Sequence, residues 1–180
     1  GVHTLTLHRC PLLSDISGLR RLTSLSIKEC HNITSLSPLM SNVHTLELID
    51  CDGVSDVSSL TIHTLSIKMC RHLCALTSRV HTLTLDRCSL ITDVSPLSHV
   101  HNLELSWMNG ISDISGLSNV QNLTIQGLDL ITDLSPISNV PNVRVLSCTN
   151  VSDISVLSHV DTLILHSCHR IKDVTALSTI

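Results

Sequence analysis

The sequence predicts an α/β solenoid, mostly β, built from nine repeats in one array. Two observations lead to this fold class: a Leu-x-Leu pair recurs at a near-constant spacing, and each pair lies in a short stretch that alternates apolar and polar residues. Successive pairs begin 18 to 21 residues apart, at Leu5, Leu25, Leu46, Leu65, Leu83, Leu103, Leu123, Val143 and Leu163. A fixed period of this length indicates a coil whose units pack only on their neighbours.

Each repeat is expected to begin with a strand and to return through a short turn. Alternation through Leu-x-Leu predicts a strand with one buried face. A repeat of this length leaves no room for an α-helix. The pairs Ser37–Pro38, Ser95–Pro96 and Ser135–Pro136 predict a serine N-cap followed by proline at the first helical position. One helical or 3₁₀ turn per repeat is therefore expected.

The repeat also carries a family resemblance. Residues 80–93, VHTLTLDRCSLITD, resemble a cysteine-containing leucine-rich repeat, and residues 94–97, VSPL, resemble the short back half of internalin-type bacterial repeats. The resemblance extends over the whole chain. It implies a right-handed coil with a parallel β-sheet on the concave side and turns or 3₁₀ segments on the convex side.

Composition and charge narrow the classes of function. Hydrophobic residues make up 42% of the chain, yet Phe and Tyr are absent and Trp107 is the single Trp, so aliphatic residues and Cys must form the core. The formal charge is −4 and the eleven basic residues are scattered, which argues against nucleic acid and anionic membranes as partners. No apolar run approaches the roughly 20 residues of a membrane span.

One repeat position is almost always cysteine. Because the cysteines recur at the repeat length and form no CxxC pair, we expect inward-facing, reduced thiols that form a structural ladder rather than disulfides or a metal site. Free thiols favour a reducing intracellular compartment, although a signal peptide could lie outside this segment. The ladder comprises Cys10, Cys30, Cys51, Cys70, Cys88, Cys148 and Cys168.

A second position is occupied by aspartate. Stacked carboxylates could bind Ca²⁺, but calcium-binding solenoids carry several acidic positions per repeat. We expect Asx turns instead, in which each carboxylate accepts a hydrogen bond from the backbone N–H two residues later. The column comprises Asp15, Asp56, Asp93, Asp113, Asp133, Asp153 and Asp173.

A row of histidines precedes the predicted strands. His44, His63, His81 and His101 lie on consecutive repeats, and His3 holds the same position earlier. The preferred interpretation is a solvated row without a dedicated role. Two alternatives are a transition-metal site and neutral stacking that protonation would disrupt. A threonine array for ice binding is disfavoured, because charged and apolar residues interrupt it.

The outward-facing strand residues form a mixed polar surface of the kind that recognises proteins. Trp107 lies at the end of its strand, where it is either an interface hot spot or a plug for an altered loop. The predicted partner-binding residues are Glu47, Thr64, Ser66, His81, Thr84, Asn102, Glu104, Trp107, Asn122, Thr124 and Arg144.

The repeat between Cys70 and Cys88 is irregular. It is two residues shorter than most, with Cys74 in the Thr/Ser position and Ala75 where Asp is expected. We expect a truncated convex turn and a local change of curvature at this repeat.

No catalytic constellation, metal site or cofactor motif is predicted, so the chain is not expected to be an enzyme. Residues 1–180 are expected to form a single uncapped array that is part of a longer one. The leading hypothesis is a scaffold that binds an unidentified protein through the concave sheet. The alternative is a structural subunit that stacks head to tail on identical copies into a filament.

Overall fold

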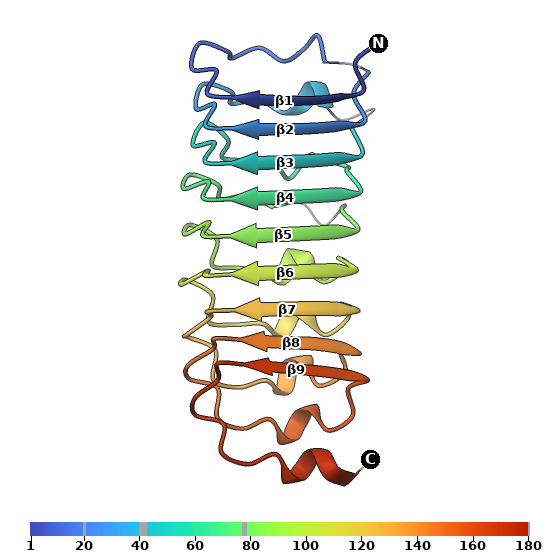
Figure 1. Ribbon diagram of the computed structural model, residues 1–180, viewed down its shortest axis with the longest axis vertical. Coiled ribbons are helices and arrows are strands. Elements are labelled where there is room, and N and C mark those ends of the chain that lie inside the picture. Colours follow the sequence, from blue (N-terminus) through green and yellow to red (C-terminus); the bar gives the residue numbers. More distant parts are fainter. Residues whose placement is uncertain (20, 40–42, 77–78, 180) are drawn as a thin grey trace.

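A computed structural model describes residues 1–19, 21–39, 43–76 and 79–179. In this part of the chain, nine strands form one sheet in which every neighbouring pair is parallel and the spatial order follows the sequence (Figure 1). The strands are β1 (Thr4–His8), β2 (Ser24–Lys28), β3 (Thr45–Ile49), β4 (Thr64–Lys68), β5 (Thr82–Asp86), β6 (Asn102–Ser106), β7 (Asn122–Gln126), β8 (Asn142–Leu146) and β9 (Thr162–His166).

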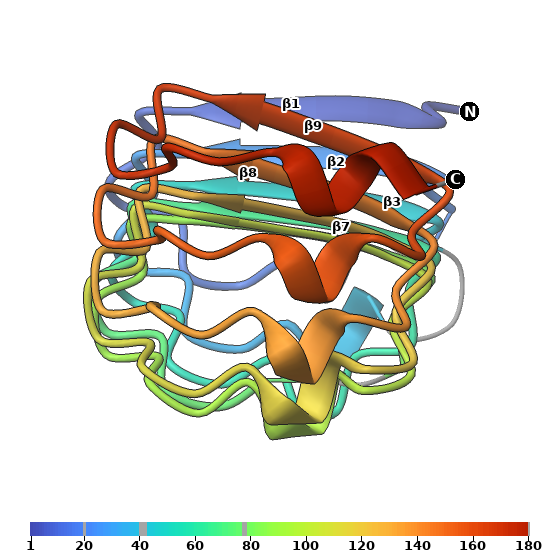
Figure 2. The ribbon, with the colours of Figure 1, turned by 90° about the horizontal axis from the view of Figure 1, so that it is seen from below.

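Short 3₁₀ segments lie opposite the sheet. They are η1 (Ser37–Leu39), η2 (Ser95–Leu97), η3 (Ser115–Leu117), η4 (Ser135–Ile137), η5 (Ser155–Leu157) and η6 (Thr175–Thr179). Seen along the coil, β1 and β9 curve away from the 3₁₀ side relative to the central strands, so the sheet lines the concave face (Figure 2). The predicted fold class is confirmed. No helix among the described residues has the length and hydropathy to cross a bilayer.

A left-handed residue follows every strand. Eight of these residues are not glycine, with φ between 50° and 56°, and the ninth is Gly127 with φ 61°. Their amides continue the parallel ladder: the Arg87 N–H donates to the Ser106 carbonyl at 3.0 Å, and the Trp107 N–H donates to the Gln126 carbonyl at 2.8 Å. The chain thus leaves the sheet in a turn that loses no ladder hydrogen bond.

The convex turns show how the aspartates act. Each of the seven predicted carboxylates accepts a hydrogen bond from the backbone N–H two residues later, at 2.7–2.9 Å. Hydrogen bonds from that Ser or Thr lower the pKa of each carboxyl group. The predicted serine N-caps are wrong at two turns, because Val94 and Leu134 occupy the cap positions and neither makes a side-chain cap bond. Asp93 and Asp133 bond instead to the amides of the first 3₁₀ residues.

The short repeat has no 3₁₀ segment among its described residues. Its backbone bonds directly to the preceding repeat, where the Cys74 N–H donates to the Ser55 carbonyl at 2.9 Å and Asp56 and Ala75 form a parallel bridge. The truncated convex turn is therefore observed as far as Leu76; residues 77–78 lie outside the described part of the chain.

The core is a single aliphatic column that runs the length of the coil. Strands β2 to β5 share one burial pattern, with the second and fourth residues buried. In-register pairing places Leu46, Leu65 and Leu83 in contact along the coil axis. Each repeat therefore depends on its two neighbours for burial.

We expect Leu65→Ala to lower the free energy of unfolding by about 2–5 kcal/mol, because it opens a cavity in this column. Leu65 is fully buried. Leu12, which is 93% exposed, supplies the control, and Leu12→Ala should change stability by less than about 0.5 kcal/mol. Urea unfolding followed by circular dichroism measures both; equal losses would contradict the assignment of the core.

Candidate functional site

The concave face presents the middle residue of each strand to solvent. This mid-strand row holds Glu47, Ser66, Thr84, Glu104, Thr124 and Arg144 on consecutive strands from β3 to β8. None of the six is buried. The structure thus brings six of the predicted partner-binding residues into one continuous row.

The first residues of the strands form a second row beside it. The Asn122 amide donates to the Asn102 side-chain oxygen at 2.6 Å, and the Asn102 amide donates to Thr82 Oγ1 at 3.0 Å. Thr64 holds the same position on β4. These side chains are partly satisfied by one another, so this row is more ordered and less available to a partner than the mid-strand row.

His81 belongs to a stack that precedes the strands. The rings of His44, His63, His81 and His101 lie face to face, with consecutive centroids 4.5–4.7 Å apart and interplanar angles of 11–27°. Desolvation lowers the pKa of His81, and His101 and His63 lower it further. The neutral rings can therefore stack at this spacing, whereas protonated rings would repel one another.

Trp107 lies at the opposite end of its strand, in the left-handed position after β6. It is 38% exposed, and Arg87 is 6.0 Å from its ring centroid. The ring covers Gly127, where an added Cβ would approach the Trp107 ring to 2.3 Å. Gly127 thus leaves room for the indole, which closes one side of a hollow on the sheet.

That hollow has a volume of about 240 Å³ and spans β4 to β7. Its lining is mostly polar and comprises Ser66, Lys68, Thr84, Asp86, Arg87, Glu104, Ser106, Trp107 and Gln126. Asp86 Oδ1 is buried without a hydrogen-bond partner among the described residues. A second hollow of about 290 Å³ surrounds Arg144 and Thr124 on β7 to β9. Two separate hollows therefore lie along the mid-strand row, and the second is lined by Leu123, Val143 and Ile164 as well as by polar side chains.

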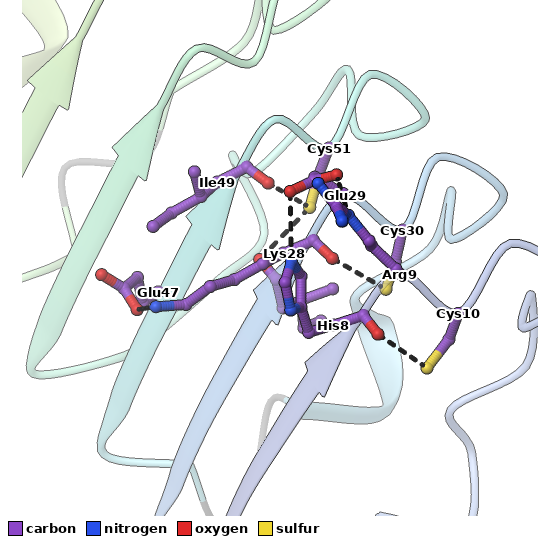
Figure 3. A network of polar contacts seen from close by, with 10 residues as sticks. His8, Arg9, Cys10, Lys28, Glu29, Cys30, Glu47, Ile49 and Cys51 are labelled. Carbon is purple, nitrogen blue, oxygen red and sulfur yellow. Dashed lines mark hydrogen bonds and ion pairs between the residues drawn. The ribbon is translucent and has the colours of Figure 1, made fainter.

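The first repeats satisfy their charges internally (Figure 3). Glu29 bridges Arg9 Nε at 2.7 Å and His8 Nε2 at 3.1 Å, and Lys28 Nζ lies 3.0 Å from Glu47 Oε2. Burial raises the pKa of Glu47, but the hydrogen bonds from Ser26 and Lys28 outweigh it and the net pKa is lowered. Glu47 is therefore on the predicted partner-binding face but already forms an ion pair with Lys28.

Glu104 and Arg144 differ from Glu47. Within the described part of the chain, Glu104 receives one hydrogen bond, from Ser106 Oγ at 3.4 Å, and forms no ion pair. Arg144 forms neither an ion pair nor a side-chain hydrogen bond to these residues. Both side chains are exposed at mid-strand. They are the charges of the mid-strand row that the fold leaves unpaired.

The cysteine column lies inside the coil, and all of its thiols are free. Each thiol donates to the carbonyl two residues earlier, as Cys30 does to Lys28 at 3.3 Å (Figure 3). Burial raises the pKa of Cys88 to about 11 and also raises the pKa values of Cys30 and Cys148. These three thiols stay protonated near neutral pH. Cys51 differs, because its hydrogen bond with the Cys70 thiol lowers its pKa to about 7.

One cluster was not anticipated by the sequence analysis. The ligand atoms of His31, Asp50 and Asp52 lie within 4.8 Å of one another, in the turns after β2 and β3. His31 and Asp52 share the repeat position after the cysteine, so aligning that column could have indicated the contact. Asp52 Oδ1 already accepts the Arg71 N–H at 2.9 Å, which stabilises the next turn.

The comparisons with known proteins concern the fold. A scan of protein-family models and a search of curated proteins each return no match for this chain. Among solved structures, the chain is similar to the crystal structure of an internalin (inlF) from Listeria monocytogenes, with 23% identity and a TM-score of 0.49. The match covers 86% of this chain and 58% of the internalin chain. The repeats, each with one parallel strand and one tight convex turn, have the architecture of a leucine-rich-repeat coil.

The histidine stack should make the free energy of unfolding depend on pH. Because the folded pKa of His81 lies below its unfolded value of about 6.5, the unfolded state binds more protons, and stability falls as pH drops below that value. We expect His81→Gln to reduce this loss between about pH 7 and pH 5. Urea unfolding at several pH values measures it. His169→Gln changes an exposed histidine outside the stack, and an equal reduction there would contradict the role of stacking.

We expect Gly127→Ala to destabilise the protein by about 1–3 kcal/mol, because the new Cβ meets the Trp107 ring and the backbone is left-handed. Tryptophan fluorescence should report the displaced Trp107 ring, and urea unfolding should measure the loss in free energy of unfolding. Ser147 has the same backbone conformation one repeat later, so Ser147→Ala is the control. Adding Trp107→Ala should restore part of the lost stability; if it restores none, the steric explanation is wrong.

Proposed function

We propose that this chain is a leucine-rich-repeat scaffold without catalytic activity that binds another protein through its concave sheet face. Solenoids of stacked repeats offer extended concave surfaces that suit such binding. The observation that carries the proposal is the contrast between columns. The Cys and Asp side chains are engaged by nearby backbone groups, whereas the mid-strand row faces solvent and passes Trp107, which is 38% exposed, at β6.

The residues proposed to bind the partner are those of the mid-strand row together with Thr64, Asn102, Asn122, His81 and Trp107. Trp107 is the strongest candidate for a hot spot, because tryptophan offers a large, rigid contact area and is enriched at such positions. Thr124 lines the hollow around Arg144 and lies on β7, between the strands that carry Glu104 and Arg144. A bulky side chain at Thr124 would therefore obstruct any partner that lies along the row.

The test is affinity capture with matched variants. Wild type, Thr124→Arg and Ser112→Arg are immobilised and exposed to extract from the source organism. Ser112 is exposed on the loop from β6 to η3 and adds the same charge away from the sheet. We expect a specific protein that Thr124→Arg binds at least about tenfold more weakly, or about 1.4 kcal/mol, and that Ser112→Arg retains.

Two results would oppose the proposal. Equal binding by all three forms would place the partner on another face. Particles that grow with concentration alike in all three forms, measured by light scattering, would support the head-to-tail filament instead. That alternative stays a prediction.

A further inference from the structure

We infer that the concave face selects a polyproline II segment of its protein partner, with a basic side chain over Glu104 and an acidic side chain three residues away over Arg144. This inference rests on the proposed function and specifies the chemistry of the partner. It is carried by the two unpaired charges of the mid-strand row, by their spacing and by the hollows around them.

Two other carboxylates of the sheet already form ion pairs within the chain. Glu47 is paired with Lys28 at 3.0 Å and Asp86 with Arg87 at 3.3 Å. Glu104 and Arg144 have no such partner among the described residues. An exposed ion pair formed within one chain adds little stability, but unpaired charges at an interface select partners that carry the opposite sign.

Glu104 and Arg144 form no ion pair with each other in the described part of the chain. Glu104 and Arg144 are each in register with Thr124, so one strand, β7, separates them (Figure 1). Two strand spacings of about 4.8 Å place their backbones roughly 9.6 Å apart. Thr124 between them is short and neutral. A partner can therefore reach both charges at once, while neither satisfies the other.

A polyproline II helix matches this spacing. It has three residues per turn and rises about 3.1 Å per residue, so side chains three apart share one face at about 9.3 Å. In a β-strand, by contrast, same-face side chains recur every two residues at about 6.6 Å, and positions three apart face opposite ways. The segment would lie across the strands, along the coil axis.

The two hollows fit side chains of opposite charge. The hollow at Glu104 offers its carboxylate, which attracts a guanidinium or ammonium group, beside the Trp107 ring, over which Arg87 already lies at 6.0 Å. Lys68 lines the β4 side of this hollow. Asp86 also lines it; its Oδ2 lies 3.3 Å from Arg87 Nη1, while its Oδ1 has no hydrogen-bond partner among the described residues. The hollow at Arg144 includes the Asn122 and Asn142 amides and no carboxylate. Arg144 suits a carboxylate, whereas the two amides already donate to Asn102 and to the Gln121 carbonyl.

Lys68 extends the pattern on the other side of Glu104. It forms no ion pair within the described residues, and it lies at the end of β4, two strands before Glu104. The unpaired charges therefore alternate as positive, negative and positive at every second strand. A partner that continues past Glu104 would gain affinity from a second acidic side chain near Lys68.

The test uses a display library of random peptides of about twelve residues, which is four turns of polyproline II. Selection on wild-type protein should enrich peptides with a basic and an acidic residue three positions apart and with proline between them. No enrichment, or enriched peptides without this charge pair, would overturn the inference.

Charge exchange then tests the assignment of each side chain. In the double variant Glu104→Arg, Arg144→Glu, the order of basic and acidic residues in the enriched peptides should reverse. The wild-type peptides should lose at least about tenfold in affinity. The control exchanges an existing ion pair, with Arg9→Glu and Glu29→Arg, and should leave the order unchanged. An unchanged order in the first variant would overturn the inference.

The failure of this inference and of the proposed function can be told apart. Peptides that ignore the charge exchange but are blocked by Thr124→Arg would leave concave-face binding intact while removing the charge selection. Peptides that none of these substitutions affects would oppose both. Circular dichroism and urea unfolding of every variant establish that the comparison is between folded proteins.

Discussion

The rest of the structure depends on one backbone constraint, a residue held in the left-handed region directly after each strand. Its amide bonds to the last carbonyl of the next strand, so the parallel ladder extends one residue beyond the sheet. The turn also directs the next side chain inward, where Cys30 and Cys88 donate to backbone carbonyls. A left-handed backbone costs a non-glycine residue on the order of 1 kcal/mol, and the stacked neighbours on both sides offset that cost.

The left-handed position tolerates many side chains. These side chains differ between repeats and form one edge of the concave face. It holds Arg9 and Glu29 on adjacent repeats, where they pair with each other. At Trp107 it holds an indole, which is possible because the next repeat has Gly127 beneath the ring. At this edge the backbone conformation is the same from repeat to repeat while the side chains differ.

The polar groups of the coil fall into two kinds. Those of the cysteine and aspartate columns repeat with the period of the fold and are bonded to backbone amides or carbonyls of the turns, so they stabilise it and have little capacity left for a partner. Those of the mid-strand row have no such acceptors or donors, because the backbone beneath them is engaged in the sheet. Only a neighbour along the coil axis can satisfy them, as Lys28 does for Glu47. At Glu104 and Arg144 no ion pair forms within the described part of the chain.

The sequence by itself determined the repeat, the strand in each repeat, the inward face and the aspartate turns, because these follow from spacing along the chain and from contacts within about two residues. Only the tertiary structure decided which charges are paired and which are free, that Asp93 rather than Ser95 supplies the capping bond, and that Trp107 covers Gly127. It also brought His31 to Asp50 and Asp52. These features depend on which side-chain conformers reach across to the adjacent strand or turn, and the repeat spacing fixes the positions of the backbones but not those conformers.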